Sequence, residues 1–193
     1  DRTPPFIGKN NYRGAQIKSL QQMKLLKKKG IKHILSLSGD SYSQQKCDGQ
    51  SDPCEKMWAK DLGMTWTKVH LGSRPPNDAD WQMIREMLAK GGVFVHCTSG
   101  VDRTGAIVAR FRKEVEPDMT DQAVLNDYTY KFGGAWKGAK DSNRYLRAWV
   151  QDGKFDPELR KKLDRSLIPV VPIAASICGV LLLGFVIYRW RRG

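Results

Sequence analysis

The chain of 193 residues is long enough for one compact domain, and its apolar fraction of 40% is sufficient for a hydrophobic core. Its formal net charge of +13 favours anionic partners, such as phosphorylated substrates or acidic lipid surfaces. Zinc-type cysteine pairs, an RNA-binding aromatic signature and an arginine-rich tract are absent from the sequence, so we expect no nucleic-acid partner, no metal site and no cofactor.

The first part of the chain predicts a helix followed by a strand. Residues 1–10 are an N-terminal extension, and because Asp1 rather than methionine stands first, a removed signal peptide is one explanation for this start. Apolar residues recur at helical spacing over 17–26, and Gly30 supplies a stop. Residues 31–38 are predicted to form a strand.

Two cysteines, Cys47 and Cys54, lie in the polar loop that follows. Their spacing permits a local disulfide in an oxidising compartment, whereas in a reducing one they would be free thiols in a surface loop. The sequence does not fix the compartment, so both alternatives stay open. A short helix over 55–62 and a strand over 64–71 are predicted next.

The stretch 92–105 has the pattern of a strand, a tight loop and a helix start. β-forming residues over 93–95 follow the glycine pair that ends a predicted helix with apolar residues from Met83 to Leu88. Helical spacing resumes after Arg103. Gly100 permits the unusual backbone angles that such a loop needs, and the backbone N–H groups of the loop and of the first helical turn can converge on a phosphate.

Cys97, at the start of this loop, is the predicted nucleophile. A helix N-terminus and a nearby cation lower a thiol pKa, which makes the thiolate available at neutral pH for attack on phosphorus. Arg103 can place two N–H groups on the phosphoryl oxygens and stabilise the transition-state charge. Thr104 could donate a hydrogen bond to the sulfur as it leaves, and His96 is expected to orient the loop.

The run from His96 to Gly105 resembles the His-Cys-x5-Arg-Ser/Thr signature of the protein tyrosine and dual-specificity phosphatase superfamily. Its Asp-Arg-Thr-Gly ending is similar to bacterial and plant or fungal members of the dual-specificity type, some of which act on phosphoinositides or inositol phosphates. Those members often carry lysine where this chain has Val101, which argues against a highly charged inositol substrate. The Tyr-Arg-Gly-x-Gln opening and the following helix and strand extend the resemblance over residues 11–150.

The resemblance implies a hydrolase that forms a phosphocysteine intermediate. The phosphate-binding loop would consist of Thr98, Ser99, Gly100, Val101, Asp102 and Arg103, and the implied catalytic set is Cys97, Arg103, Asp78, Thr104 and His96. Asp102 would either pair with Arg103 or bind a cation on a neighbouring loop. The substrate would be a phosphorylated protein, or a phospholipid or inositol phosphate.

Members of this superfamily use an aspartic acid on a loop as the general acid, which protonates the leaving oxygen and later activates water. In this chain residues 72–81 form the matching predicted loop, which ends with residues typical of a helix start. Asp78 is the first choice for the acid and Asp80 the second. Either residue could instead be a helix N-cap.

Helices are also predicted from Thr120 and over residues 140–150. Alternating strands and helices followed by a terminal run of helices predict an α/β domain, a small central sheet flanked by helices. We assign residues 11–153 to this phosphatase domain and residues 154–166 to a basic juxtamembrane linker.

Residues 167–188 are 22 consecutive residues without a charge, long enough as a helix for a bilayer core of about 30 Å. They are predicted to form a C-terminal transmembrane helix, followed by a basic tail over 189–193. Basic residues on both sides leave the orientation open. After signal-peptide removal the domain would face away from the cytoplasm; otherwise the protein would be a tail-anchored cytosolic enzyme in contact with membrane lipid.

Two functions of different classes fit these patterns. One is a membrane-anchored cysteine phosphatase that acts on phosphotyrosine or phosphoserine/threonine proteins. The other is a non-catalytic membrane adaptor that uses the loop only to bind phosphate. The presence of both Cys97 and Arg103 favours the enzyme.

Overall fold

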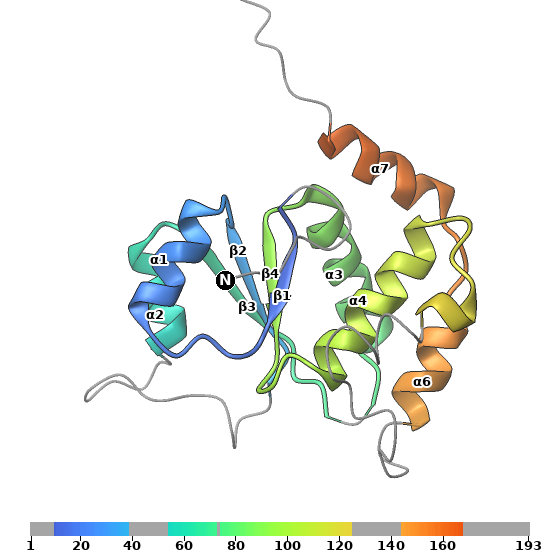
Figure 1. The fold of residues 1–193 in the computed structure, drawn as a ribbon, viewed down its shortest axis with the longest axis horizontal. Helices are drawn as coiled ribbons and strands as arrows, with labels where there is room; N and C mark the ends of the chain where they lie inside the picture. Colours follow the sequence, from blue (N-terminus) through green and yellow to red (C-terminus); the bar gives the residue numbers. More distant parts are fainter. Residues whose placement is uncertain (1–9, 39–53, 73, 125–143, 168–193) are drawn as a thin grey trace, which may run out of the picture.

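Four short parallel strands form the centre of the protein, in the order β1-β4-β2-β3 (Figure 1). The computed structural model describes residues 10–38, 54–72, 74–124 and 144–167. The strands are β1 Tyr12–Gly14, β2 His33–Ser36, β3 Thr65–Lys68 and β4 Val93–His96. Every residue of β4 is buried, as expected for a central parallel strand with helices on both faces. The loop after β4 therefore leaves from the middle of the sheet.

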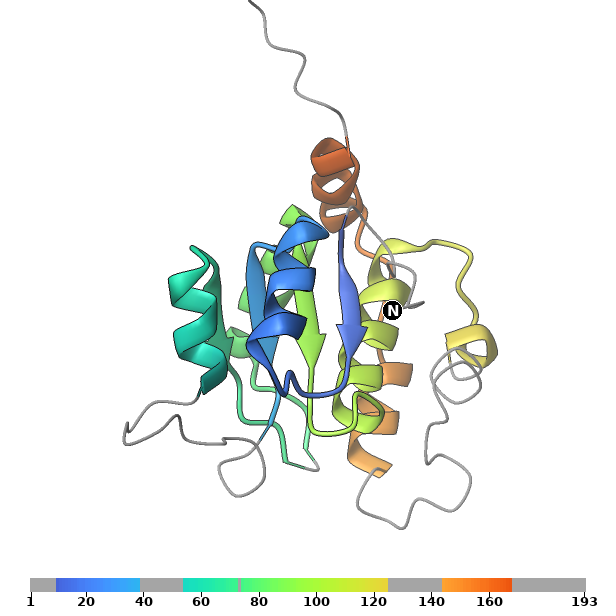
Figure 2. The same cartoon turned by 60° about the vertical axis from the view of Figure 1, so that its left-hand side comes forward.

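Helices cover both faces of this sheet (Figure 2). One face carries α1 Leu20–Lys28 and α2 Cys54–Asp61, and the other carries α3 Asp78–Lys90 and α4 Asp102–Val115. Two further helices, α6 Arg144–Gln151 and α7 Pro157–Leu167, pack on the α3–α4 layer, with α6 against α4 and α7 against both α3 and α4. The predicted α/β fold with a small sheet flanked by helices is confirmed.

The side chains of β4 alternate between two hydrophobic clusters. Val93 and Val95 belong to the cluster under α3, α4 and α7, whereas Phe94 belongs to the cluster under α1 and α2. This period of two is the geometry of an extended strand. Cys97 continues the alternation and joins the α3–α4 cluster. The sheet thus places the predicted nucleophile on a defined face before the loop begins.

Local signals fix the helix ends near the site. The Ser19 side chain accepts a hydrogen bond from the backbone N–H of Gln22 at the start of α1, at 3.2 Å. The Asn77 side chain does the same for the N–H of Asp80 at the start of α3, at 2.8 Å. Such N-caps satisfy N–H groups that have no partner inside the helix.

The structure corrects two assignments made from the sequence. The strand β1 was not predicted; it is three residues long and takes its conformation from pairing with β4. Residues 154–166, expected as a linker, largely form α7, whose Leu159 and Leu163 are buried in the α3–α4 cluster. Because many residues of this helix are charged, its narrow apolar face is hard to recognise in the sequence. That face consists of the two buried leucines, which lie four positions apart.

The predicted transmembrane helix lies almost entirely outside the described residues. Residues 168–188, which make up nearly all of it, lie outside the described residues, as do the extension 1–9 and the tail 189–193. Within the parts of the chain that the structure does describe, no helix has both the length and the apolar character needed to cross a bilayer.

Candidate active site

Cys97 lies at the carboxyl end of β4, and the short loop 98–101 leads from it into α4. The residue is 1% exposed and its thiol is free. Gly100 within the loop has φ +75°, a left-handed conformation that favours glycine. The predicted strand, loop and helix start are therefore all present, although α4 begins at Asp102 rather than at Thr104.

Gly100 is required for a second reason, its close approach to β1. A Cβ atom built on Gly100 would lie 2.3 Å from the carbonyl carbon and oxygen of Gly14. The backbone N–H of Gln16 also donates to the carbonyl of Thr98, at 3.3 Å. The first strand and the residues after it thus form a wall against which the loop is packed.

Arg13 of β1 ties the same wall to the loop by its side chain. Arg13 is 2% exposed, and its Nη2 donates to the carbonyl oxygens of Gly100 at 2.9 Å and Val101 at 3.4 Å. Because these carbonyl groups point toward Arg13, the N–H groups of the same loop can point to the opposite side of the loop. The sequence contained Arg13 only as part of the Tyr-Arg-Gly resemblance, without a role.

The loop stabilises the thiolate of Cys97. Burial acts to raise the pKa of this thiol. Hydrogen bonds from the Thr104 hydroxyl and from the backbone N–H groups of Thr104 and Gly100, together with the positive charge of Arg103, outweigh burial and hold the pKa of Cys97 below its ordinary value. The Thr104 hydroxyl is fully buried and has no other hydrogen-bond partner among the described residues.

The guanidinium of Arg103 is held by neutral oxygen atoms. Its Nη1 donates to the carbonyls of Leu37 at 3.2 Å and Leu71 at 3.3 Å, and its Nη2 donates to the Thr98 hydroxyl at 3.2 Å. These carbonyls follow β2 and β3, so the ends of three neighbouring strands meet at this side chain. Arg103 uses these acceptors rather than the Asp102 carboxylate, and its charge is available to an anion.

His96 is buried directly behind Cys97. Its ring stacks on Phe94, and its Nδ1 lies 3.3 Å from the carbonyl oxygen of Cys97. Its Nε2 lies 2.6 Å from Oε1 of Glu55, which is within ion-pair distance although the two atoms lack the alignment of a hydrogen bond. Glu55 is a partner that the sequence analysis did not identify. The available signal was its position on the helical face of buried Ala59, where an acidic residue is unusual.

The remaining loop residues are more accessible. Thr98, Val101 and Asp102 are half-buried, and Ser99 is exposed at the loop surface. Asp102 is the first residue of α4, where a negative charge is favoured by the helix dipole.

The two candidate acids lie in the first turn of α3. Asp78 is the first residue of α3 and is exposed to solvent, whereas the carboxylate of Asp80 accepts a hydrogen bond from the Asn77 side chain, at 3.0 Å. The loop that leads to them leaves β3 past Leu71, whose carbonyl contacts Arg103. Asp80 is therefore engaged in the N-cap, and Asp78 is the more available carboxylate on the segment that follows the Arg103 contact.

Comparison with known proteins identifies the family. The family described as a DSP-PTPase phosphatase fused to NAD+ kinase matches residues 9–143, more than half of the chain. The chain belongs to this phosphatase family. No curated protein sequence matches it significantly. The suspected resemblance to cysteine-based, dual-specificity-like phosphatases is confirmed, and the chain is a cysteine-based phosphatase, a phosphoric monoester hydrolase.

Solved structures agree on the fold. P. aeruginosa TpbA shares 23% identity at a TM-score of 0.56, covering 82% of this chain and 88% of its own. The catalytic domain of the S. cerevisiae PP-IP phosphatase SIW14 shares 16% identity at 0.60, covering 86% of this chain and 92% of its own. PTPMT1 in complex with PI(5)P shares 13% identity at 0.55, covering 84% of this chain and 97% of its own.

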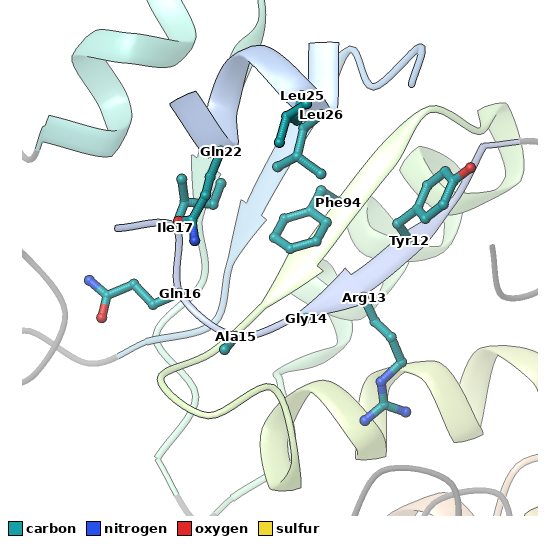
Figure 3. A pocket seen from close by; sticks show the side chains of 10 residues that line it. All are labelled: Tyr12, Arg13, Gly14, Ala15, Gln16, Ile17, Gln22, Leu25, Leu26 and Phe94. Carbon is teal, nitrogen blue, oxygen red and sulfur yellow. The ribbon is translucent and has the colours of Figure 1, made fainter. Parts of the chain in front are cut away.

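The phosphatase also has a mostly apolar cavity of about 370 Å³ beside β1, away from Cys97 (Figure 3). It lies between α1 and β1, over the ring of Phe94, and neither Cys97 nor Arg103 lines it. The Arg13 side chain points away from this cavity, in keeping with its hydrogen bonds to the loop that follows Cys97.

The other described cysteine differs from the free Cys97 in its oxidation state. Cys54, the first residue of α2, is disulfide-bonded. Cys47, which the spacing made its possible partner, lies outside the described residues. Among the residues that the structure describes, no group of three or more histidine, cysteine or acidic side chains could hold a metal ion.

Proposed function

We propose that the protein hydrolyses phosphate monoesters of phosphorylated proteins, on tyrosine or on serine and threonine, through a phosphocysteine intermediate. The observation that carries the proposal is the free, buried Cys97 thiol, whose pKa is lowered by donors that converge on it beside the Arg103 guanidinium. A thiolate next to an anion-binding arginine has the two components that nucleophilic attack on a phosphate dianion requires.

The reaction has two steps. In the first, the Cys97 thiolate forms the S–P bond while the P–O bond to the leaving group breaks, and Asp78 gives a proton to the departing oxygen. In the second, water attacks phosphorus, Asp78 takes the proton, and the S–P bond breaks to return the thiolate and inorganic phosphate. Arg103 and the loop N–H groups bind the phosphoryl oxygens in both steps, and the Thr104 hydroxyl stabilises the sulfur as it leaves.

The composition of the loop supports a singly phosphorylated substrate. Thr98, Ser99 and Val101 are uncharged, and Asp102 is acidic. A substrate with several phosphates would gain from lysine in these positions, and none is present. Among similar structures, TpbA was solved with phosphotyrosine, whereas PTPMT1 was solved with PI(5)P, so phosphoinositides and inositol phosphates are the alternative substrate class.

A substrate panel tests this proposal. Initial rates of phosphate release by the full chain are compared for phosphotyrosine and phosphoserine/threonine peptides, phosphoinositides and inositol phosphates, with Cys97→Ser as the control. We expect kcat/KM to be highest on phosphopeptides and turnover by Cys97→Ser to be lost, with binding of a phosphate analogue retained. Preferred hydrolysis of inositol phosphates would contradict the substrate class, and equal turnover by Cys97→Ser would contradict the mechanism.

We further propose that residues 167–188 anchor the enzyme in a membrane as a single C-terminal span. The support is the uncharged length of this segment, whose first residue is the last residue of α7. Extraction of membranes with alkaline carbonate tests the anchor. The full chain should stay in the pellet until detergent is added, and a chain that carbonate releases would contradict the proposal.

A further inference from the structure

Glu55 occupies an unusual place for an acidic residue. It lies in the first turn of α2, where the helix dipole favours a negative charge, but such residues normally face water. Glu55 is 4% exposed and its carboxylate meets the imidazole of His96, which is fully buried. Taking a carboxylate out of water is costly unless it is paired, so His96 is the group that makes this position tolerable.

The two ring nitrogens of His96 both face acceptors. Nδ1 lies 3.3 Å from the Cys97 carbonyl oxygen, which can only accept, and Nε2 lies 2.6 Å from Oε1 of Glu55. The imidazole is therefore held from both sides, by the main chain at Cys97 and by the carboxylate of Glu55.

We propose that Glu55 is a positioning residue for the Cys97 thiol: through His96 it fixes the main chain at Cys97 and so the place of the sulfur among its hydrogen-bond donors. The inference rests on the proposed function only for its effect on turnover. The effect on the thiolate stands on the geometry of the pair alone. Glu55 itself touches no reacting atom.

Within the described residues, the neighbours of the pair lie in the sheet, in the loop and the helix after it, and in α2. In the sheet, His96 pairs with Gly14 of β1 and with Ser36 of β2, and neither side chain titrates. The loop contributes Cys97 itself and Arg103. Arg13 of β1 contacts the loop carbonyls, and on α2 the neighbouring Lys56 is exposed to solvent.

Burial of both partners distinguishes this pair from a salt bridge between exposed side chains, where ordering the side chains offsets much of the attraction.

The test measures the Cys97 thiolate directly. The full chain is alkylated with iodoacetamide over a range of pH, and modification of Cys97 is followed by mass spectrometry. Glu55→Gln keeps the shape and removes the charge that faces His96, so the imidazole should be held less firmly and the sulfur should shift relative to its hydrogen-bond donors. The midpoint of alkylation should then move to higher pH by about one unit, a usual size for hydrogen-bond effects on a pKa. The acid limb of kcat/KM should move in the same direction.

Glu114→Gln is the matched control. Glu114 is equally buried, at 3% exposed, but pairs with Arg85 and Arg110 in the helical layer. Its replacement should lower the melting temperature and leave the alkylation midpoint unmoved. If Glu55→Gln does not fold, Glu55→Asp carries the test, because it keeps the charge on a shorter side chain and should give a smaller shift in the same direction.

Two outcomes would overturn the inference. One is a Glu55→Gln midpoint equal to that of the wild type, and the other is an equal shift in Glu114→Gln, which would show a general loss of stability. Failure of the proposed function looks different. In that case the wild type lacks Cys97-dependent turnover, while the alkylation profile still reports whether Glu55 acts on the thiol.

Discussion

Two clusters of half-buried arginines on the α3–α4 side of the sheet are built in opposite ways. Beside the loop that follows Cys97, Arg103 of α4 donates to two carbonyls and one hydroxyl, all of them neutral. In the helical layer, Arg110 Nε lies 2.6 Å and Arg85 Nε 3.0 Å from the carboxylate of Glu114. Both clusters hold their side chains firmly, but only the second neutralises its charge.

The difference separates function from stability. A guanidinium held by carbonyls keeps a positive charge that a phosphate can compensate. The charge of a guanidinium paired with a carboxylate is already compensated by that carboxylate. The helical cluster also fixes Trp81, whose indole N–H donates to Glu114 at 3.2 Å. We therefore expect substitutions in the first cluster to change activity and those in the second to change folding.

The largest effect should come from replacing arginine by lysine in each cluster. Arg103→Lys keeps the charge but loses the two-pronged donor, and kcat/KM should fall by about 10³–10⁵-fold, the range for arginines that stabilise phosphoryl transfer. Arg85→Lys should leave kcat/KM unchanged and lower the melting temperature. Steady-state kinetics and thermal unfolding of both variants check this. Comparable activity losses in the two variants would remove the distinction.

The next effect concerns Asp78, the proposed general acid. Asp78→Asn should lower the rate on an alkyl phosphate by about 10²–10⁴-fold and much less on an activated aryl phosphate, which leaves without a proton. The basic limb of the rate profile should vanish with it. Asp80→Asn should show neither change, because its carboxylate serves the N-cap. If Asp80→Asn shows both changes instead, the roles are exchanged.

Glycine substitutions sharpen the comparison further. Gly100→Ala would place a methyl group against the β1 backbone and displace the loop, and kcat should fall by about 10²-fold, as for a misplacement of about 1 Å. Gly63 has a similar φ, +64°, but nothing within 4 Å of a built Cβ. Gly63→Ala should therefore lose about 1–2 kcal/mol of unfolding free energy and retain kcat. A retained kcat in Gly100→Ala would show that the close packing against β1 is not needed.

The sequence predicted the parts of the molecule that are encoded locally. The strand, loop and helix around Cys97 follow from short patterns, and the structure has them within two residues of the predicted bounds. The roles of Arg13 and Glu55 depend on contacts with residues far away in the chain, at Gly100 and His96. No local pattern contains that information. Helix α7 was missed for a related reason, since its two buried leucines acquire meaning only against α3 and α4.

The smallest effect is a pH dependence in the helical cluster. Burial acts to raise the pKa of Asp156, but the N–H groups of Leu159 and Glu158 and the charge of Arg85 outweigh it and lower the pKa. In the unfolded chain this carboxyl takes up protons at higher pH, so its stabilising contribution is present above its ordinary pKa, about 4, and is lost as pH falls through the lower folded value.

Asp156→Asn keeps the N-cap of α7 and removes the charge. Its unfolding free energy should be lower than that of the wild type by up to about 1 kcal/mol at neutral pH, with the gap closing in acid. Urea unfolding at a series of pH values measures this. A gap that widens as pH falls would contradict the assignment, and kcat/KM should be the same in both proteins.

The central claim, that Cys97 carries the phosphoryl group, is tested most directly by trapping the intermediate. The wild-type chain is mixed with a rapidly hydrolysed aryl phosphate, quenched in acid within the first turnover, and digested for mass spectrometry. We predict one phosphate on the peptide that contains Cys97, and none in Cys97→Ser. Turnover without phosphate on Cys97 in the wild type, or sustained turnover by Cys97→Ser, would contradict the account.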